Sequence, residues 1–136
     1  MDQMCREKSK SLVKIIEKHK KMLDKLISAD CFFLKDLNID FWKNNKKHRV
    51  EGVYILLDEK NKIIYSGKTS TKTILDRVGN QHIYGGSSSD LRDMLGRPSM
   101  MAVTKYKCKY LEVKNYRNRS MFEHFVISIM QPPLNK

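Results

Sequence analysis

Residues 52–67 of the chain read Gly-Val-Tyr-Ile-Leu-Leu-Asp-Glu-Lys-Asn-Lys-Ile-Ile-Tyr-Ser-Gly. The runs 52–57 and 62–67 are rich in apolar and β-branched residues, and the polar residues 58–61 between them favour a turn. This pattern predicts a β-hairpin. Because the register of a hairpin fixes the face on which each side chain lies, Tyr54 and Tyr65 can point into one site, although paired tyrosines in a hairpin more often pack than react.

The segments on both sides of this hairpin add helices and one more strand. Apolar residues recur at steps of three and four over residues 9–28, which predicts a helix whose opposite face is rich in lysine. Further predicted elements are an apolar packed loop or short helix over 32–43, a helix from Ser70 or Thr71 to about Gln81, a short helix over 90–95, a third strand within 102–114 and a last helix from Ser120 to about Met130. This order predicts an α+β fold with a small, three-stranded, mainly antiparallel sheet flanked by helices.

The length and the cysteines limit the class of protein. A chain of 136 residues and 16.0 kDa is one domain, in which we expect residues 1–50 to form an N-terminal helical extension packed on a core of residues 51–136. The three cysteines lie far apart without metal-ligand spacing, which favours a reducing, cytoplasmic location over a disulfide framework or a zinc site. No apolar run approaches the ~20 residues of a spanning helix, so we expect no membrane partner.

The charge of the chain points to a polyanionic partner. The formal net charge is +12 and the pI is about 9.7, which is typical of proteins that bind nucleic acid. A solvated helix surface is the commoner explanation for the lysines of residues 9–28. The residues expected to contact DNA are Lys46, Lys47, Arg49, Ser88, Arg92 and Arg97.

Residues with chemical potential follow the hairpin in a particular order. Arg77 lies in the helix predicted after the hairpin, Glu123 in the first turn of the last helix, and Asn135 near the end of the sequence. Together with Tyr54, Tyr65 and the glycines Gly52 and Gly67, this order resembles the GIY-YIG endonuclease superfamily, from about Gly52 to Lys136. Val53 and Ser66 replace the isoleucines of the family's name, and the family's helix histidine corresponds to His82, one position later than usual.

The resemblance implies a metal-dependent DNA endonuclease. Phosphodiester hydrolysis needs an activated water, a cation for the charged transition state and a stabilised leaving oxygen. The resemblance implies that Glu123 binds one Mg²⁺ or Mn²⁺ ion, that Tyr54 activates or orients water, and that Tyr65 and Arg77 hold the scissile phosphate. Lys68 would lower the pKa of a nearby phenol, and His82 and Asn135 would complete the catalytic set.

The same resemblance suggests a biological context. The serine-rich turn and Leu-Arg pair of residues 87–92 are similar to those of some restriction enzymes in the superfamily, so we expect a restriction-like or mobile-element (homing) nuclease acting on double-stranded DNA. A single site cuts one strand at a time. Double-strand cleavage would therefore require a homodimer or two sequential nicks.

Several alternatives remain open at this stage. The run Ser120 to Glu123 has the pattern of a capping box, in which Glu123 would only close a helix terminus. Glu112 and Lys114, with Asp90 or Asp93 upstream, resemble a PD-(D/E)xK nuclease site. A non-catalytic nucleic-acid-binding module on the same fold would share the charge, and an RNA-binding protein would use exposed aromatics such as Tyr106 and Tyr110.

Overall fold

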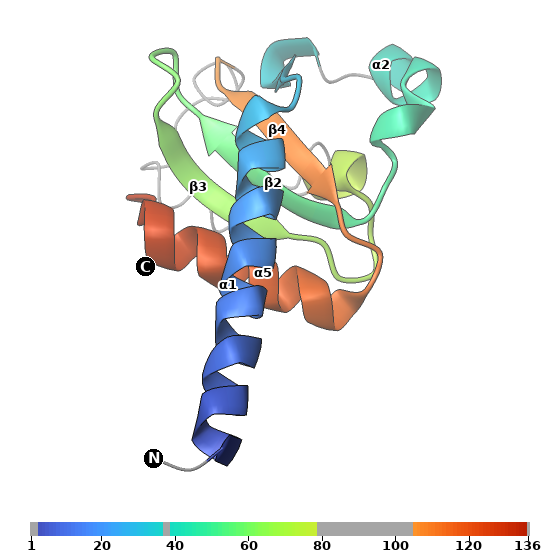
Figure 1. The fold of residues 1–136 in the computed structure, drawn as a ribbon. Coiled ribbons are helices and arrows are strands. Elements are labelled where there is room, and N and C mark those ends of the chain that lie inside the picture. Colours follow the sequence, from blue (N-terminus) through green and yellow to red (C-terminus); the bar gives the residue numbers. More distant parts are fainter. Residues whose placement is uncertain (1–2, 37–38, 79–104, 136) are drawn as a thin grey trace.

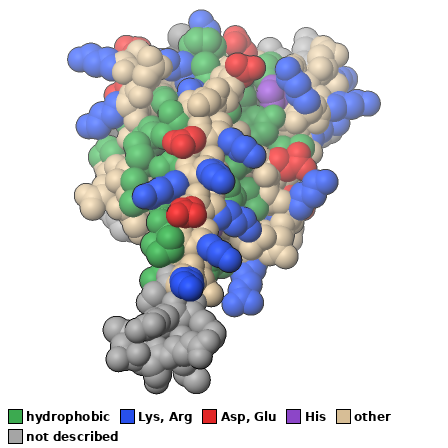
Figure 2. Space-filling model, viewed as in Figure 1, with side chains coloured by type: hydrophobic (Ala, Val, Ile, Leu, Met, Phe, Trp, Pro, Cys, Tyr) green, Lys and Arg blue, Asp and Glu red, His purple; other side chains and the backbone are tan. Residues whose placement is uncertain are grey.

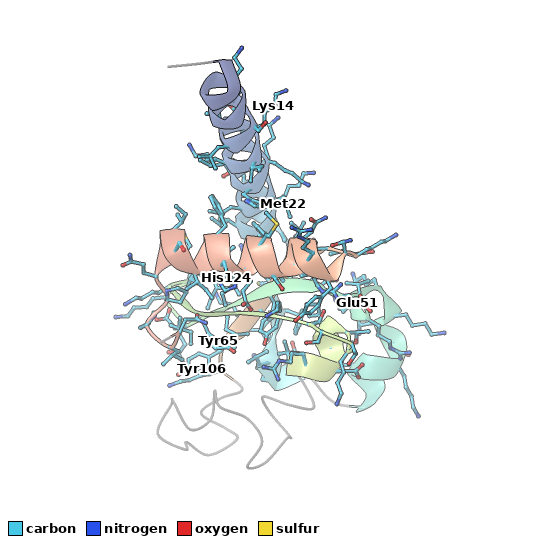
Figure 3. All side chains as sticks on the ribbon, turned by 90° about the horizontal axis from the view of Figure 1, so that it is seen from below. Lys14, Met22, Glu51, Tyr65, Tyr106 and His124 are labelled. Carbon is cyan, nitrogen blue, oxygen red and sulfur yellow. The ribbon has the colours of Figure 1, made fainter. Side chains whose placement is uncertain are left out.

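The computed structural model describes residues 3–36, 39–78 and 105–135. Its four antiparallel strands form one sheet in the order β1-β4-β2-β3. The strands are β1 (Phe32–Phe33), β2 (Gly52–Leu57), β3 (Ile63–Lys68) and β4 (Lys107–Glu112). The helices α1 (Gln3–Ser28) and α5 (Tyr116–Met130) cover one face of this sheet, as Figures 1 and 3 show. The 3-10 turn η1 (Leu34–Asp36), the helix α2 (Ile39–Asn44) and the 3-10 turn η2 (Lys46–His48) connect β1 to β2.

The central strand β2 explains the apolar hairpin sequence. It pairs with β3 on one side and with β4 on the other, and all six of its residues are buried. A strand covered on both faces is continuously apolar instead of alternating. Gly52 begins β2 because a Cβ at this position would lie 2.1 Å from the carbonyl oxygen of Leu111 on β4.

Each face of the sheet has its own hydrophobic cluster. On the α1/α5 face, Val53, Ile55 and Leu57 pack with residues of the two helices, among them Leu26 and Phe122. On the opposite face, buried residues of β1, β2, β3, β4, η1 and the segment after β3 pack together; they are Phe32, Leu34, Tyr54, Leu56, Ile64, Ile74, Leu75, Val78 and Cys108. The sheet is thus the middle layer of an α+β domain.

The predicted hairpin is present, but the sheet has one strand more than predicted. The hairpin is confirmed, with β3 starting and ending one residue later than the predicted run 62–67. The sheet has a fourth strand, β1, because Phe32 and Phe33 of the predicted packed loop pair with Cys108 and Lys107. Residues 1–50 therefore contribute a strand to the same sheet as residues 51–136, and the division at residue 50 stays a prediction.

Three predicted helix starts are wrong: those of the last helix, of the helix after the hairpin and of the helix predicted over 9–28. The last helix begins at Tyr116 instead of Ser120, because the side chain of Asn115 accepts a hydrogen bond from the Asn118 N–H at 3.1 Å and caps the helix there. The helix after the hairpin begins at Ile74 instead of following Ser70 or Thr71. The Thr73 hydroxyl accepts a hydrogen bond from the Asp76 N–H (3.4 Å) and donates one to the Asp76 carboxylate (3.0 Å).

Helix α1 begins at Gln3, earlier than the predicted residue 9, and its N-terminal part extends away from the sheet (Figure 1). Its exposed lysines are Lys10, Lys14, Lys18, Lys20, Lys21 and Lys25, and blue side chains line this helix in Figure 2. Among the described residues, no helix has the length and apolar character needed to cross a membrane. The predicted short helix over 90–95 lies outside the described residues.

Candidate active site

A cavity of about 330 Å³ lies at the end of β3, next to α5. Tyr65, Lys68, Arg77 and Glu123, four of the residues singled out from the sequence, are among its lining side chains. The full lining is Tyr65, Gly67, Lys68, Thr69, Ser70, Thr71, Lys72, Arg77 and Glu123. Residues from a strand, a connecting segment, a helical turn and α5 therefore meet in one place.

Tyr54 lies behind this cavity, fully buried in the sheet. Its ring centroid is 6.2 Å from that of Tyr65 on the neighbouring strand, so the hairpin does bring the two phenols together. Gly67 makes room for the Tyr54 ring, because a Cβ at this position would lie 2.4 Å from the Tyr54 hydroxyl. Burial raises the pKa of Tyr54 well above its usual value, and the Arg77 guanidinium opposes this rise.

Arg77 connects the two phenols. It lies in the helical segment after Thr73, with its N–H bonded to the Thr73 carbonyl at 2.9 Å, and its side chain hydrogen-bonds to both Tyr54 and Tyr65. Burial also raises the pKa of Tyr65, while Arg77 lowers it and the Glu123 carboxylate raises it further. Arg77 is therefore a cation that favours ionisation of both phenols, and an effect of Lys68 on a phenol pKa stays a prediction.

Lys68 instead faces Glu123. Its Nζ lies 3.6 Å from Glu123 Oε1, and the two side chains are 24% and 14% exposed. Burial raises the pKa of Glu123, although the positive charges of Lys68 and His124 oppose the shift. Because α5 begins at Tyr116, Glu123 lies in the interior of the helix, and the capping-box interpretation of this residue is wrong.

Asn135 is bound to the outer edge of β3. The side-chain amide of Asn135 donates a hydrogen bond to the Ser66 carbonyl (2.8 Å) and accepts one from the Ser66 N–H (2.7 Å). The Leu134 N–H donates a hydrogen bond to the Ile64 carbonyl (3.0 Å). These bonds replace the neighbouring strand that an edge strand lacks. Asn135 thus fixes the backbone between Tyr65 and Gly67.

The basic residues Lys46, Lys47 and Arg49 precede β2 at the same end of the sheet as the cavity. The Ile74 N–H donates to the Val50 carbonyl at 2.8 Å and the Thr69 N–H to the Gly52 carbonyl at 3.0 Å, which joins the two segments. His48 Nδ1 lies 2.5 Å from the Tyr110 hydroxyl, which donates to the Lys47 carbonyl at 3.1 Å and holds the η2 turn. His82, Ser88, Arg92 and Arg97 lie outside the described residues.

The alternative PD-(D/E)xK site has weaker support. Glu112 and Lys114 lie 3.8 Å apart on solvent-exposed positions, with side chains 45% and 89% exposed. In the part of the chain that the structure describes, no group of three or more His, Cys, Asp or Glu residues is placed to hold a metal ion. Asp90 and Asp93 lie outside that part. Tyr110, one of the aromatics considered for RNA stacking, is instead bonded to His48 and Lys47.

Sequence reasoning missed Arg119 and the segment 69–72. Arg119 is buried on α5, and its guanidinium contacts the backbone of Thr69 and Ser70 in the cavity wall. The only signal in the sequence was its position one helical turn before Glu123. Ser70, Thr71 and Lys72 carried no distinguishing pattern beyond the expected helix cap.

Comparisons with known proteins give a likeness of fold. The structure is similar to the GIY-YIG N-terminal endonuclease domain of UvrC from Thermotoga maritima bound to its catalytic magnesium, with a TM-score of 0.47 and 19% identity over 85% of this chain and 97% of that one. A point mutant of the same domain matches with a TM-score of 0.49 and 19% identity, over 73% of this chain and 98% of that one. No protein-family model and no curated protein matches the sequence. The chain has an α+β fold, in which helices flank an antiparallel sheet.

Proposed function

We propose that the protein is a metal-dependent DNA endonuclease that hydrolyses phosphodiester bonds. The observation that carries this proposal is the meeting of Tyr65, Arg77, Lys68 and Glu123 around one cavity, with Tyr54 directly behind it. This set combines two cations, a carboxylate and two phenols, in a chain with a net charge of +12. Phosphate is the substrate group that matches such a combination.

Arg77 and Lys68 would bind the scissile phosphate. A guanidinium stays charged at any physiological pH and presents several donors to phosphate oxygens, so Arg77 can bind the phosphate and the two phenols together. Lys68 supplies a second positive charge in the cavity lining, where its Nζ lies 3.6 Å from Glu123 Oε1. Both cations would stabilise the additional negative charge of the transition state.

Glu123 is the residue that would hold a divalent metal ion. Its carboxylate lines the cavity, is mostly shielded from solvent and offers the hard oxygen atoms that Mg²⁺ and Mn²⁺ prefer. One carboxylate is sufficient for an ion that keeps several waters and takes further ligands from a phosphate. The bound ion would supply Lewis-acid stabilisation of charge on the phosphate.

The tyrosines would orient the reacting groups. Burial raises the pKa of both phenols, so their neutral forms are favoured at neutral pH. A neutral phenol can accept one hydrogen bond and donate another. Of the two possible roles for Tyr54, orientation of the attacking water through Tyr65 and Arg77 therefore fits its burial better than ionisation to a strong base.

Double-stranded DNA is the proposed substrate, and a restriction-like or mobile-element role in the cytoplasm is the proposed context. The η2 turn would contact phosphates beside the cleaved one, because it lies at the same end of the sheet as the cavity. Lys46 and Lys47 in this turn and Arg49 directly after it supply the positive charge. A homodimer would cut both strands in one encounter.

The test is incubation of supercoiled plasmid with the pure protein, in Mg²⁺ or in EDTA. We expect nicked or linear DNA with Mg²⁺ alone, and a discrete band pattern if cleavage is sequence-specific. Glu123→Ala should abolish cleavage, whereas the control Glu112→Ala should cut like the wild type. Salt-sensitive binding without cutting on several DNAs would indicate the non-catalytic binding module, and loss of activity only in Glu112→Ala would move the site to the alternative motif.

A further inference from the structure

Arg119 is the most extensively bonded buried charge in the described residues. Its side chain is 3% exposed, and its guanidinium donates hydrogen bonds from all three nitrogens. The acceptors are the carbonyls of Thr69 (2.9 Å), Ser70 (2.9 Å), Val113 (3.0 Å) and Lys114 (2.9 Å) and the carboxylate of Glu51 (2.7 Å). The ring of Tyr116 lies 5.4 Å from the guanidinium carbon.

These acceptors belong to three separate segments of the chain. Thr69 and Ser70 follow β3 and line the cavity, Val113 and Lys114 connect β4 to α5, and Glu51 precedes β2. Arg119 itself lies on α5, one helical turn before Glu123. A single side chain therefore joins the helix that carries Glu123 to the segment between Lys68 and Arg77.

Stability alone is a poor explanation for a charge at this position. Burying a guanidinium carries a large desolvation cost, and packed apolar side chains of similar volume often stabilise a fold as well or better. Four of the five acceptors are main-chain carbonyls, and the only carboxylate is 42% exposed. What an arginine offers here is geometry, because its planar fork of donors fixes several carbonyls relative to one another.

We propose that Arg119 is a positioning residue, which sets the cavity wall Thr69–Ser70 against Glu123. Through this wall it maintains the 3.6 Å separation of Lys68 and Glu123 and places the start of the helix that carries Arg77. Arg119 does not line the cavity, so it acts through these residues instead of touching substrate. The kinetic part of this inference rests on the proposed nuclease function.

The kinetic test compares Arg119→Lys with three other variants in steady-state cleavage of a defined duplex. Lysine keeps the positive charge but cannot donate to all of the carbonyls that the planar guanidinium joins. We therefore expect kcat to fall about 100-fold, the loss that follows when reacting groups shift by about 1 Å. KM for DNA should stay within about threefold, because the phosphate-binding side chains remain. Arg117→Lys, at an exposed position on the same helix, should match the wild type. All assays are run at a temperature where circular dichroism shows each variant folded.

Two further variants separate positioning from stability. Glu51→Gln removes the ion pair but leaves the carbonyl bonds, so its kcat should stay within about threefold of wild type. Arg119→Met removes every bond and should lose as much kcat as Arg119→Lys even where it is fully folded. Equal losses of kcat in Glu51→Gln and Arg119→Lys, or a wild-type kcat in folded Arg119→Lys, would overturn the proposal.

An activity-independent measurement keeps the inference separate from the proposed function. Amide hydrogen exchange should accelerate in residues 69–72 of Arg119→Lys, while residues 52–57 of β2 keep their protection. Unchanged exchange in residues 69–72 would overturn the anchoring role even if the protein proves to be a nuclease. Conversely, a wild-type protein that cuts no DNA would refute the nuclease, and the exchange data would still decide whether Arg119 anchors the wall.

Discussion

The contact between Gly67 and Tyr54 gives a sharp prediction about how the site is built. An alanine Cβ at residue 67 would lie 2.4 Å from the Tyr54 hydroxyl oxygen and 2.5 Å from its Cζ. Both separations are about 1 Å shorter than van der Waals contact allows. Tyr54 cannot move aside easily, because it is fully buried and hydrogen-bonded to Arg77. Gly67→Ala must therefore displace the tyrosine or the strand.

The expected cost follows from this overlap. Overpacking of a buried site costs about 1–3 kcal/mol, and alanine regains about 0.5 kcal/mol by restricting the unfolded chain. We expect a net loss of about 1.5 kcal/mol, which lowers Tm by about 5 °C for a chain of this size. Cleavage should fall as well, because the Tyr54, Tyr65 and Arg77 group shifts with the ring.

A double-mutant cycle tests the assigned cause. In a Tyr54→Leu background the ring is gone, so Gly67→Ala should cost less than about 0.5 kcal/mol in urea unfolding. The control is Gly52→Ala, whose Cβ would meet the backbone carbonyl of Leu111, and its cost should be the same in both backgrounds. An unchanged stability of Gly67→Ala, or an equal cost with and without the Tyr54 ring, would refute the reasoning.

Three further predictions concern stability. Asn135→Ala removes the side chain that hydrogen-bonds to the N–H and the carbonyl of Ser66, so the free energy of unfolding in urea should fall by about 1–3 kcal/mol. An unchanged free energy of unfolding would mean that the Asn135 amide does not stabilise the edge of β3. Because Asn115 is the N-cap of α5, Asn115→Ala should lower the free energy of unfolding by about 1 kcal/mol and Ser120→Ala by less than about 0.5 kcal/mol. A larger loss for Ser120→Ala than for Asn115→Ala would restore the capping box at Ser120. Burial, and secondarily Lys18, lowers the pKa of His19, so the unfolded chain takes up its proton first and stability should fall as the pH drops below about 6.5. His19→Leu should flatten part of this dependence between pH 7 and 5, where the lowered pKa of His48 adds to the fall and the raised pKa of Glu123 opposes it; an unchanged slope would contradict the assignment.

The extent to which sequence predicted this structure differs from element to element. The hairpin was predictable because its apolar runs and turn are local, and Tyr54 and Tyr65 follow from its register. Strand β1 was not, because two residues form a strand only through pairing with β4, far along the chain. The start of α5 was ambiguous because Asn115 and Ser120 are both good N-cap residues.

The residues of the candidate site also differ in how far the sequence predicts them. Glu123 and Arg77 could be proposed from their order in the sequence, but their distance from Lys68, Tyr54 and Tyr65 depends on how β3, α5 and the segment 69–77 pack. The contact between Lys68 and Glu123 could not be predicted for this reason. Arg77 is the cation that hydrogen-bonds to both phenols, and an effect of Lys68 on a phenol pKa stays a prediction. The burial of Arg119 depends on three segments that only the fold brings together.

The central claim is that Glu123 is needed for the chemistry and not for holding DNA. The most direct measurement compares Glu123→Gln with the wild type for binding and cleavage of one labelled duplex, with binding measured by fluorescence anisotropy in EDTA and cleavage after addition of Mg²⁺. The amide has nearly the same shape but no charge for a metal ion, so we expect Kd within about threefold of wild type and a cleavage rate at least about 100-fold lower. Cleavage at the wild-type rate by Glu123→Gln, or no cleavage by the wild type on any DNA that it binds, would contradict the account.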